Sequence, residues 1–307
     1  MPESPAVLAP RRESGHRAWI TGSRAADVDA YRAAVAGVDI RAVRVGHGVG
    51  PNTVRVLRAG RVTFTACRMG YPILTRTAIP DDHLIIANIT SAAPGSRWRE
   101  MDLHAGLSLV YAPDAEHTAT NKVGLEFAFT TTTIDAILDR AEQLGTAVRL
   151  PDRGSVHELP SSEPSAVAAH QRGLAEIPSG TAVPEPTLDD LLSAMVLDLS
   201  GAEPLRSPRV HAARIDSGRI VKDCVDFGLS VGRLPSLREL CLAGHVSERR
   251  LRDAFIAIYD TPPSAFFRAL MLTEAHRRLV MGTHPPLTVS SVAADLGFAN
   301  FGRFASY

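Results

Sequence analysis

A repeated spacing of apolar residues in the last third of this 307-residue chain limits what it can fold into. The same internal spacing returns 52 residues later, with one extra residue before the last position. The matching pairs are Leu240 and Val292, Cys241 and Ala293, Val246 and Phe298, and Leu251 and Phe304. Apolar residues on both sides of a short turn are typical of two helices that share one core. The sequence therefore predicts two helix-turn-helix units.

Capping residues mark the helices of the first unit. Ser236 and Glu239 have the spacing of a capping box, in which each side chain accepts a hydrogen bond from the other residue's backbone N–H. The turn is predicted at 243–246, and Ser247 is placed to cap the next helix. Thr288 and Asn300 are expected to cap the two helices of the second unit.

The outward face of the second helix in the first unit is basic. Leu251 and Phe255 lie four residues apart and must face the core. The residues that then project to the opposite side or flank it are Arg249, Arg250, Arg252 and Asp253. Arginine can donate two hydrogen bonds to guanine in a major groove, or contact phosphates. A solvated basic face is the alternative interpretation of this helix alone, and the second copy of the motif favours DNA.

A single long helix is predicted between the two units. Thr261 before Pro262 is a good helix start. An apolar ladder follows at every fourth residue, through Phe267, Met271, Ala275 and Leu279. Two units joined by a rigid helix can each place a helix in one of two successive major grooves of DNA, about 34 Å apart.

This arrangement resembles the AraC/XylS family of transcription regulators over about 217–307. The resemblance is carried by Leu240, Val246, Ser247, Leu251, Phe255, Pro263, Leu272, Ala275, Val292, Ala293, Leu296, Gly297, Phe298 and Phe304. It implies base contacts from Arg249, Arg252 and Asp253 in the first unit. In the second unit it implies a DNA-binding set of Asn300, Phe301, Gly302, Arg303 and Ser306.

The sequence departs from the family at three positions and at its end. Asp260 stands where the family has a turn glycine, and Met271 and Ser306 stand where it has arginines. Family members continue with a further aromatic core residue, a turn and a final helix. We therefore expect this chain to be truncated at its C-terminus.

The first half of the chain has the pattern of an antiparallel β-protein. Short runs of β-type residues separated by Gly and Pro clusters extend from Ile40 to about Phe129, which predicts a sandwich or small barrel. A helix is predicted at 133–144, a loop-rich connector at 150–186, and an amphipathic helix at 188–199 that either packs or forms a dimer. The predicted fold class is α+β.

The family resemblance implies a cupin-like sensor that binds an effector and supports dimerisation. The predicted domains are a sensor at 1–165, a Pro-rich connector with an amphipathic helix at 166–210, and an incomplete double helix-turn-helix domain at 211–307. Sugar, amine and aromatic acid effectors, or no ligand at all, are equally compatible with the sequence.

A faint second cupin motif lies at 106–121, with Pro113, His117 and Asn121. A metal cupin also needs an HxH…E cluster, which the sequence lacks, and His83 and His104 are isolated. We therefore expect no metal or other cofactor and no enzyme activity, and we expect His117 to be an effector-pocket or surface residue. The alternative is a cupin-type enzyme whose helical part is an accessory module.

Charge and cysteine usage complete the prediction. Residues 205–307 hold 14 basic and 9 acidic side chains, a net +5, whereas 1–204 carry −5. This asymmetry favours a polyanion partner for the C-terminal part only.

Three cysteines without CxxC spacing, no signal peptide and no apolar run of membrane length predict a cytoplasmic protein. The expected partners are double-stranded DNA, an unknown small-molecule effector, a second copy in a homodimer and RNA polymerase, with no membrane.

Overall fold

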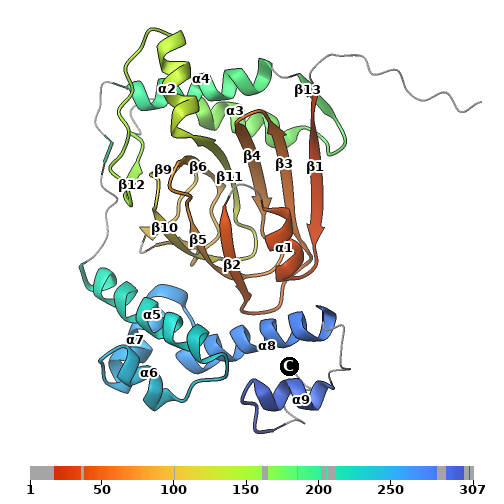
Figure 1. Ribbon diagram of the computed structural model, residues 1–307, viewed down its shortest axis with the longest axis vertical. Coiled ribbons are helices and arrows are strands. Elements are labelled where there is room, and N and C mark those ends of the chain that lie inside the picture. The colour runs from red at the N-terminus through yellow and green to blue at the C-terminus, as the bar shows by residue number, and fades with distance from the viewer. Residues whose placement is uncertain are drawn as a thin grey trace, which may run out of the picture.

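Two antiparallel sheets lie face to face in the N-terminal part of the computed structural model (Figure 1). The structure describes residues 17–35, 38–99, 101–160, 165–184, 186–201, 205–206, 212–281, 288–300 and 304. The eight-stranded sheet has the order β12 (Val156–Glu158), β9 (Ser108–Tyr111), β6 (His83–Ser91), β11 (Glu126–Thr133), β4 (Val62–Arg68), β3 (Asn52–Ala59), β1 (Arg17–Ala25) and β13 (Ala182–Pro184). The five-stranded sheet has the order β2 (Asp39–Arg44), β5 (Ile73–Ala78), β10 (Glu116–Asn121), β7 (Arg97–Trp98) and β8 (Met101–Asp102).

The predicted fold class is confirmed, in its sandwich form. The two sheets share no strand within the described residues, so they do not close into a barrel there. The strand at the centre of the larger sheet, β11, is buried on both faces. Phe127 and Phe129 point to the core between the sheets, and Ala128 points to the core under the helices.

Helices cover the outer face of the eight-stranded sheet (Figure 1). They are α2 (Ile134–Gln143), α3 (Ala166–Glu176) and α4 (Pro186–Ser200). The predicted helix at 133–144 is confirmed as α2, with Thr133 as its N-cap. The amphipathic helix at 188–199 is confirmed as α4, and most of its apolar side chains pack against its own sheet.

The loop-rich connector predicted at 150–186 is wrong in part, because α3, β12 and β13 lie within it. Tertiary contacts outweigh the local Pro and Ser signals there. Val183 of β13 pairs with Ala18 of β1. The buried Gln171 side chain of α3 accepts a hydrogen bond from Asn88 at 2.8 Å and donates to the Ile86 carbonyl at 3.0 Å. The first elements, β1 and α1 (Val28–Ala34), also precede the strand region that the sequence indicated.

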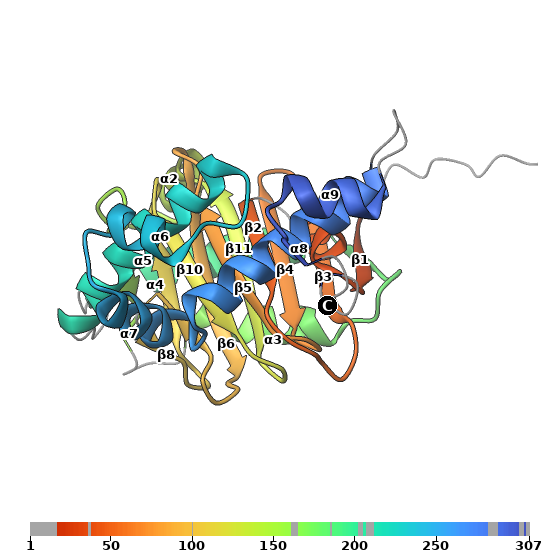
Figure 2. The same cartoon turned by 90° about the horizontal axis from the view of Figure 1, so that it is seen from below.

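The last third of the described chain is helical, as predicted. Its elements are α5 (Ala212–Val231), α6 (Leu237–Ala243), α7 (Glu248–Tyr259), α8 (Pro263–Met281) and α9 (Val289–Asp295). Figure 2 shows α8 running across the underside of the sandwich, from α7 to α9. None of the described helices is long and apolar enough to cross a membrane.

The linking helix joins two cores. Its ladder residue Phe267 is buried with α5, α6 and α7, whereas Met271 and Ala275 are buried against α9. The last ladder residue, Leu279, is partly exposed. In the turn before this helix, Asp260 ends α7 in a left-handed conformation (φ 53°). Asp is one of the few non-glycine residues that adopts this conformation readily, which explains how it replaces the family's turn glycine.

Two mid-helix glycines test the packing of the helical domain. A Cβ at Gly228 of α5 would lie 2.3 Å from the ring of Phe267, whereas a Cβ at Gly173 of α3 would meet nothing within 4 Å. We expect Gly173→Ala to raise the free energy of unfolding by up to about 1 kcal/mol through helix propensity. We expect Gly228→Ala to lower it by about 1–3 kcal/mol through overpacking. Urea unfolding followed by circular dichroism measures both, and a stabilising Gly228→Ala would contradict the packing.

Candidate DNA-binding and effector sites

The first helix-turn-helix unit has the predicted local structure. Ser236 and Glu239 form the capping box of α6, with the Ser236 N–H donating to Glu239 Oε2 at 2.8 Å and the Glu239 N–H donating to Ser236 Oγ at 3.3 Å. Ser247 caps α7 through the backbone N–H of Arg250. The guanidinium of Arg233 and, to a smaller extent, the hydrogen bonds from Ser236 lower the pKa of Glu239 to about 2.

The exposed face of α7 carries the predicted base-reading residues. Leu251 and Phe255 are fully buried, and Arg249, Arg252 and Asp253 are exposed on the other side. Neither Arg249 nor Arg252 forms an ion pair with any residue that the structure describes.

Arg250 lies at the edge of this face and is already paired. Its Nη2 donates to Asp216 Oδ2 of α5 at 2.6 Å, and this bond, with a second from Arg219, lowers the pKa of Asp216. Arg250 therefore fixes α7 against α5, a contact that the sequence pattern did not reveal.

The second unit is described in part. Thr288 caps α9 and forms a capping box with Ser291. Phe298 and Phe304 pack edge to face, with ring centroids 4.8 Å apart, over a core shared with α8. Asn300 is exposed, and its carbonyl accepts a hydrogen bond from the Phe304 N–H at 3.0 Å. The other predicted DNA-binding residues, Phe301, Gly302, Arg303 and Ser306, lie outside the described residues.

The C-terminal end of α7 rests on the five-stranded sheet. The last carbonyls of a helix have no partner within the helix and carry partial negative charge. Here Arg97 of β7 donates to the Ala257 carbonyl at 2.8 Å, and the buried Thr120 of β10 donates to the Ile258 carbonyl at 3.1 Å. The sheet thus satisfies two helix-end carbonyls of the same helix that carries Arg249.

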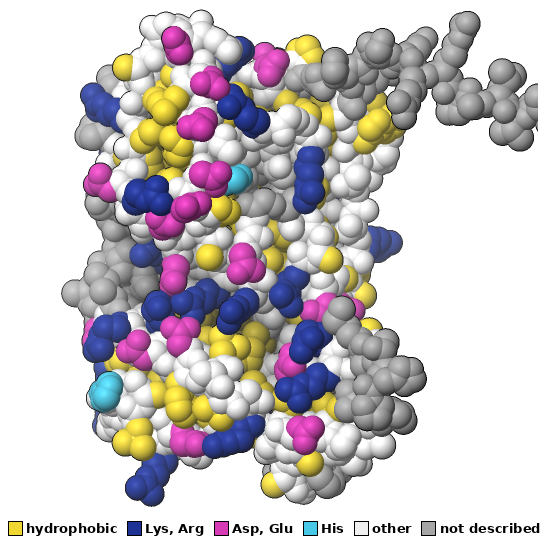
Figure 3. Space-filling view, in the orientation of Figure 1, with side chains coloured by type: hydrophobic (Ala, Val, Ile, Leu, Met, Phe, Trp, Pro, Cys, Tyr) yellow, Lys and Arg dark blue, Asp and Glu magenta, His cyan; other side chains and the backbone are white. Residues whose placement is uncertain are grey.

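Ion pairs extend this contact between the sheet and the helical domain. Lys122 pairs with Asp260 at 3.2 Å, and Arg76 of β5 pairs with Glu116 and with Asp226 of α5. Burial alone would raise the pKa of Asp226, but hydrogen bonds and charge from Arg76 and Lys222 lower it overall. Figure 3 shows Lys and Arg side chains gathered, with acidic ones among them, along the level between the sandwich and the helices.

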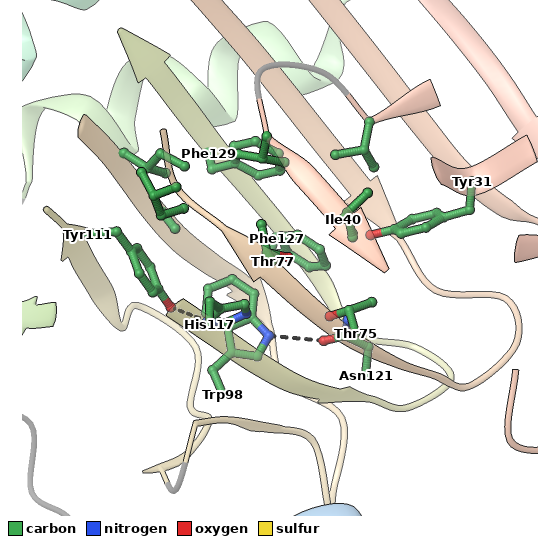
Figure 4. Close-up of a pocket in the computed structure, with 15 residues that line it drawn as sticks. Tyr31, Ile40, Thr75, Thr77, Trp98, Tyr111, His117, Asn121, Phe127 and Phe129 are labelled. Atoms are coloured by element: carbon green, nitrogen blue, oxygen red, sulfur yellow. Dashed lines mark hydrogen bonds between the residues drawn. The ribbon is translucent and has the colours of Figure 1, made fainter. Parts of the chain in front are cut away.

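A cavity of about 60 Å³ lies on the opposite face of the same sheet. Figure 4 shows side chains of both sheets pointing into it. His117 of β10, on the five-stranded side, and Tyr111 of β9, on the eight-stranded side, are joined by a hydrogen bond of 2.8 Å between the phenol oxygen and Nδ1. Beside them the Trp98 indole N–H donates to Asn121 Oδ1 at 2.9 Å. His117 therefore lies in a pocket, one of the two positions that the sequence allowed.

The imidazole of His117 is neutral. Burial, with a smaller contribution from the nearby charge of Arg99, lowers its pKa to about 3. Burial also raises the pKa of Tyr111, so the phenol keeps its proton. We assign the phenol as the donor to Nδ1, and this assignment places the hydrogen of the neutral imidazole on Nε2.

No cluster for a metal ion is present in the part of the chain that the structure describes: no three His, Cys, Asp or Glu side chains come together there. Of the cupin motif residues, His117 and Asn121 both face the cavity. The sequence singled out this motif, but it held no signal for the cavity residues of β5 and β7, which require knowledge of the strand register.

Comparison with known proteins identifies the helical region. Residues 240–307 match the family described as "Helix-turn-helix domain", which confirms the predicted AraC-type unit there. Among solved structures, the AraC-like transcriptional activator CuxR is 15% identical with a TM-score of 0.38, over 90% of this chain and 99% of that chain.

Two structures of ToxT from Vibrio cholerae are also similar. An apo variant is 7% identical with a TM-score of 0.31, over 89% of this chain and 92% of that chain. Wild-type ToxT with a bound unsaturated fatty acid is 8% identical with a TM-score of 0.27, over 96% and 91%. Likenesses this weak carry no argument, and the assignment depends on the family match.

Stability at acid pH tests the neutral state of His117. The folded pKa, about 3, lies below the ordinary value of 6.5, so its contribution is present above pH 6.5 and is lost as the pH falls toward 3. We expect the free energy of unfolding to fall by up to about 1.4 kcal/mol per pH unit from this group. His117→Gln should flatten the decline between pH 6.5 and 4 in denaturant titrations. Equal slopes for both proteins would show that the imidazole is charged when folded.

Proposed function

We propose that this chain, a DNA-binding transcription regulator with an AraC-type helix-turn-helix domain at 240–307, is controlled by a small molecule held in the cavity of its sandwich. The proposal depends on how three strands lie between the cavity and the helix-turn-helix domain. The strands β5, β7 and β10 line the cavity with one face and hold the DNA-binding domain with the other.

On β7 and on β10, one residue faces the cavity and the residue beside it holds α7. Trp98 faces the cavity and Arg97 binds the end of α7. Asn121 faces the cavity and Thr120 binds the next carbonyl of α7. Because successive side chains of a strand point to opposite faces, a ligand that moves the first residue of each pair moves the second.

DNA is read from the exposed face of α7 in this proposal. Arg249 and Arg252 have free guanidinium groups among the described residues, and Asp253 lies beside them. Arg250, held by Asp216, orients the helix and reaches phosphate at most. The second unit adds contacts from Asn300, Phe301, Gly302, Arg303 and Ser306.

The wider assignment follows from this function. The protein works in the cytoplasm as a homodimer that contacts RNA polymerase. It performs no catalysis. The predicted division at 165 and 210 remains a prediction. For an isolated sensor, residues 17–200 are the better choice, since β13, α3 and α4 complete the sandwich core.

The rival function is a cupin-type enzyme with an accessory helical module. Metal analysis of the purified protein separates the two functions. A stoichiometric transition metal would support the enzyme and oppose the regulator.

Arg249 tests the base-reading face. If it donates to a base, Arg249→Ala should cost about 1–3 kcal/mol at the specific operator, selected from random DNA, and much less on unrelated DNA. Arg172→Ala, an exposed arginine of α3, removes the same charge from the sensor and should leave both affinities unchanged. An equal loss on operator and random DNA would make Arg249 a phosphate contact.

A mutant cycle tests the link between cavity and DNA. Trp98→Phe removes the hydrogen bond to Asn121 and should change operator affinity at least threefold in the wild-type background. In a Thr120→Val background, which lacks the bond to α7, that change should shrink markedly.

The matched control for this cycle is Thr118→Val. Thr118 lies on the same face of β10, and its side chain makes no hydrogen bond to a described residue. The effect of Trp98→Phe should remain whole in that background. If it is the same in all three backgrounds, the β10 contact does not couple the two sites.

A further inference from the structure

The lining of the cavity contains no side chain that is charged at neutral pH. None of the fifteen lining residues is an Asp, Glu, Lys or Arg, and His117 is the one histidine among them. His117 is neutral because its pKa is about 3. Burial of an ion without a partner is strongly unfavourable, since the ion loses its hydration. A charged ligand would therefore enter this cavity against a large desolvation cost.

One cation, Arg99, lies behind the wall formed by the five-stranded sheet. Arg99 lowers the pKa of His117 through its charge, but its side chain lines a separate cleft between the sheet and α5 and α7. The positive charge of Arg99 therefore repels a cationic ligand in the cavity, but its side chain does not reach into the cavity to pair with an anionic ligand.

The two walls of the cavity differ in polarity (Figure 4). The wall from the eight-stranded sheet is mainly aromatic and aliphatic, with Phe127, Phe129 and Ile85. Its Tyr111 hydroxyl, from β9, is already hydrogen-bonded to His117. The wall from the five-stranded sheet carries His117 directly opposite Thr77 in the strand register, and Thr75 two residues along. A ligand in this space has one apolar side and one side with a few hydrogen-bonding groups.

The polar wall offers mainly donors to a ligand. In the assigned tautomer His117 accepts at Nδ1 from Tyr111, and Asn121 uses its oxygen for Trp98, which leaves Nε2–H and the amide N–H groups. The hydroxyls of Thr75 and Thr77 make no hydrogen bond to any described residue. A polyol has more hydroxyl groups than these few partners satisfy, and each buried hydroxyl without a partner weakens binding.

We propose that the effector is a small uncharged molecule, largely apolar, with one hydrogen-bond-accepting oxygen directed at His117, Thr75 and Thr77. This inference rests on the proposed function and names its ligand class. The volume of about 60 Å³ is several times the roughly 10–15 Å³ that one water needs, so a compact ligand fits. Among the effectors compatible with the sequence, sugars, amines and acids are the wrong chemistry for this cavity.

Fluorescence of Trp98 tests the ligand class. The chain has two tryptophans, so Trp19→Phe leaves Trp98, in the cavity wall, as the only reporter. The probes are benzyl alcohol, benzylamine, benzoate and a pentose at pH 7. We expect benzyl alcohol to change the emission at concentrations at least tenfold below those of the other three. Equal or tighter binding of any of those three, or no response to any probe, would overturn the assignment.

Isosteric variants locate the oxygen contact. Thr75→Val and Thr77→Val should each weaken benzyl alcohol severalfold while leaving toluene unaffected, because only a hydroxyl is lost. Thr65→Val is the matched control, since Thr65 is fully buried in β4, has no hydrogen-bond partner among the described residues and does not line the cavity. If Thr75→Val and Thr77→Val leave benzyl alcohol binding unchanged, the proposed oxygen contact is wrong.

Operator affinity separates this inference from the proposed function. If benzyl alcohol binds as expected but leaves operator affinity unchanged, the ligand class stands and control by the cavity fails. If a charged probe binds more tightly and shifts operator affinity, control by the cavity stands and the ligand class fails.

Discussion

The alternation of side chains along β5, β7 and β10 is the constraint on which the rest of this structure depends. Residues of one parity face the cavity, and residues of the other parity hold the helical domain. The sheet is therefore a single layer between the cavity and the first helix-turn-helix unit. Its strands cannot shift on one side without shifting on the other.

The α7 helix is held in a way that leaves its proposed DNA-binding face open. Its last carbonyls, which every helix leaves unpaired, accept hydrogen bonds from Arg97 and Thr120. Its first turns carry Arg249 and Arg252, which no described residue engages in an ion pair. A change at the C-terminal end of α7 can thus alter how its N-terminal end is presented, since a helix of 12 residues moves as one body.

Local patterns predicted the helical half well, because caps and apolar spacing act over a few residues. The capping box at Ser236, the caps at Ser247 and Thr288, and the burial of Leu251 and Phe255 are all confirmed. The cavity and the docking contact were not predictable in this way. Trp98 meets Asn121 across 23 residues through the register of β7 and β10, and Thr120 meets Ile258 across 138 residues because α7 docks on the sheet. The same long-range pairing explains α3 and β13, which lie in a segment with loop-like composition.

Hydrogen exchange at the end of α7 tests the central claim, that the cavity and α7 are mechanically linked through the sheet. The measurement compares Trp98→Phe with the wild-type protein by mass spectrometry, in the peptides over 251–260 and over α9. The account predicts faster exchange in 251–260, because Trp98 bonds Asn121 and the adjacent Thr120 bonds the Ile258 carbonyl. It predicts no change in α9. Altered exchange confined to the cavity strands, with 251–260 unchanged, would contradict it.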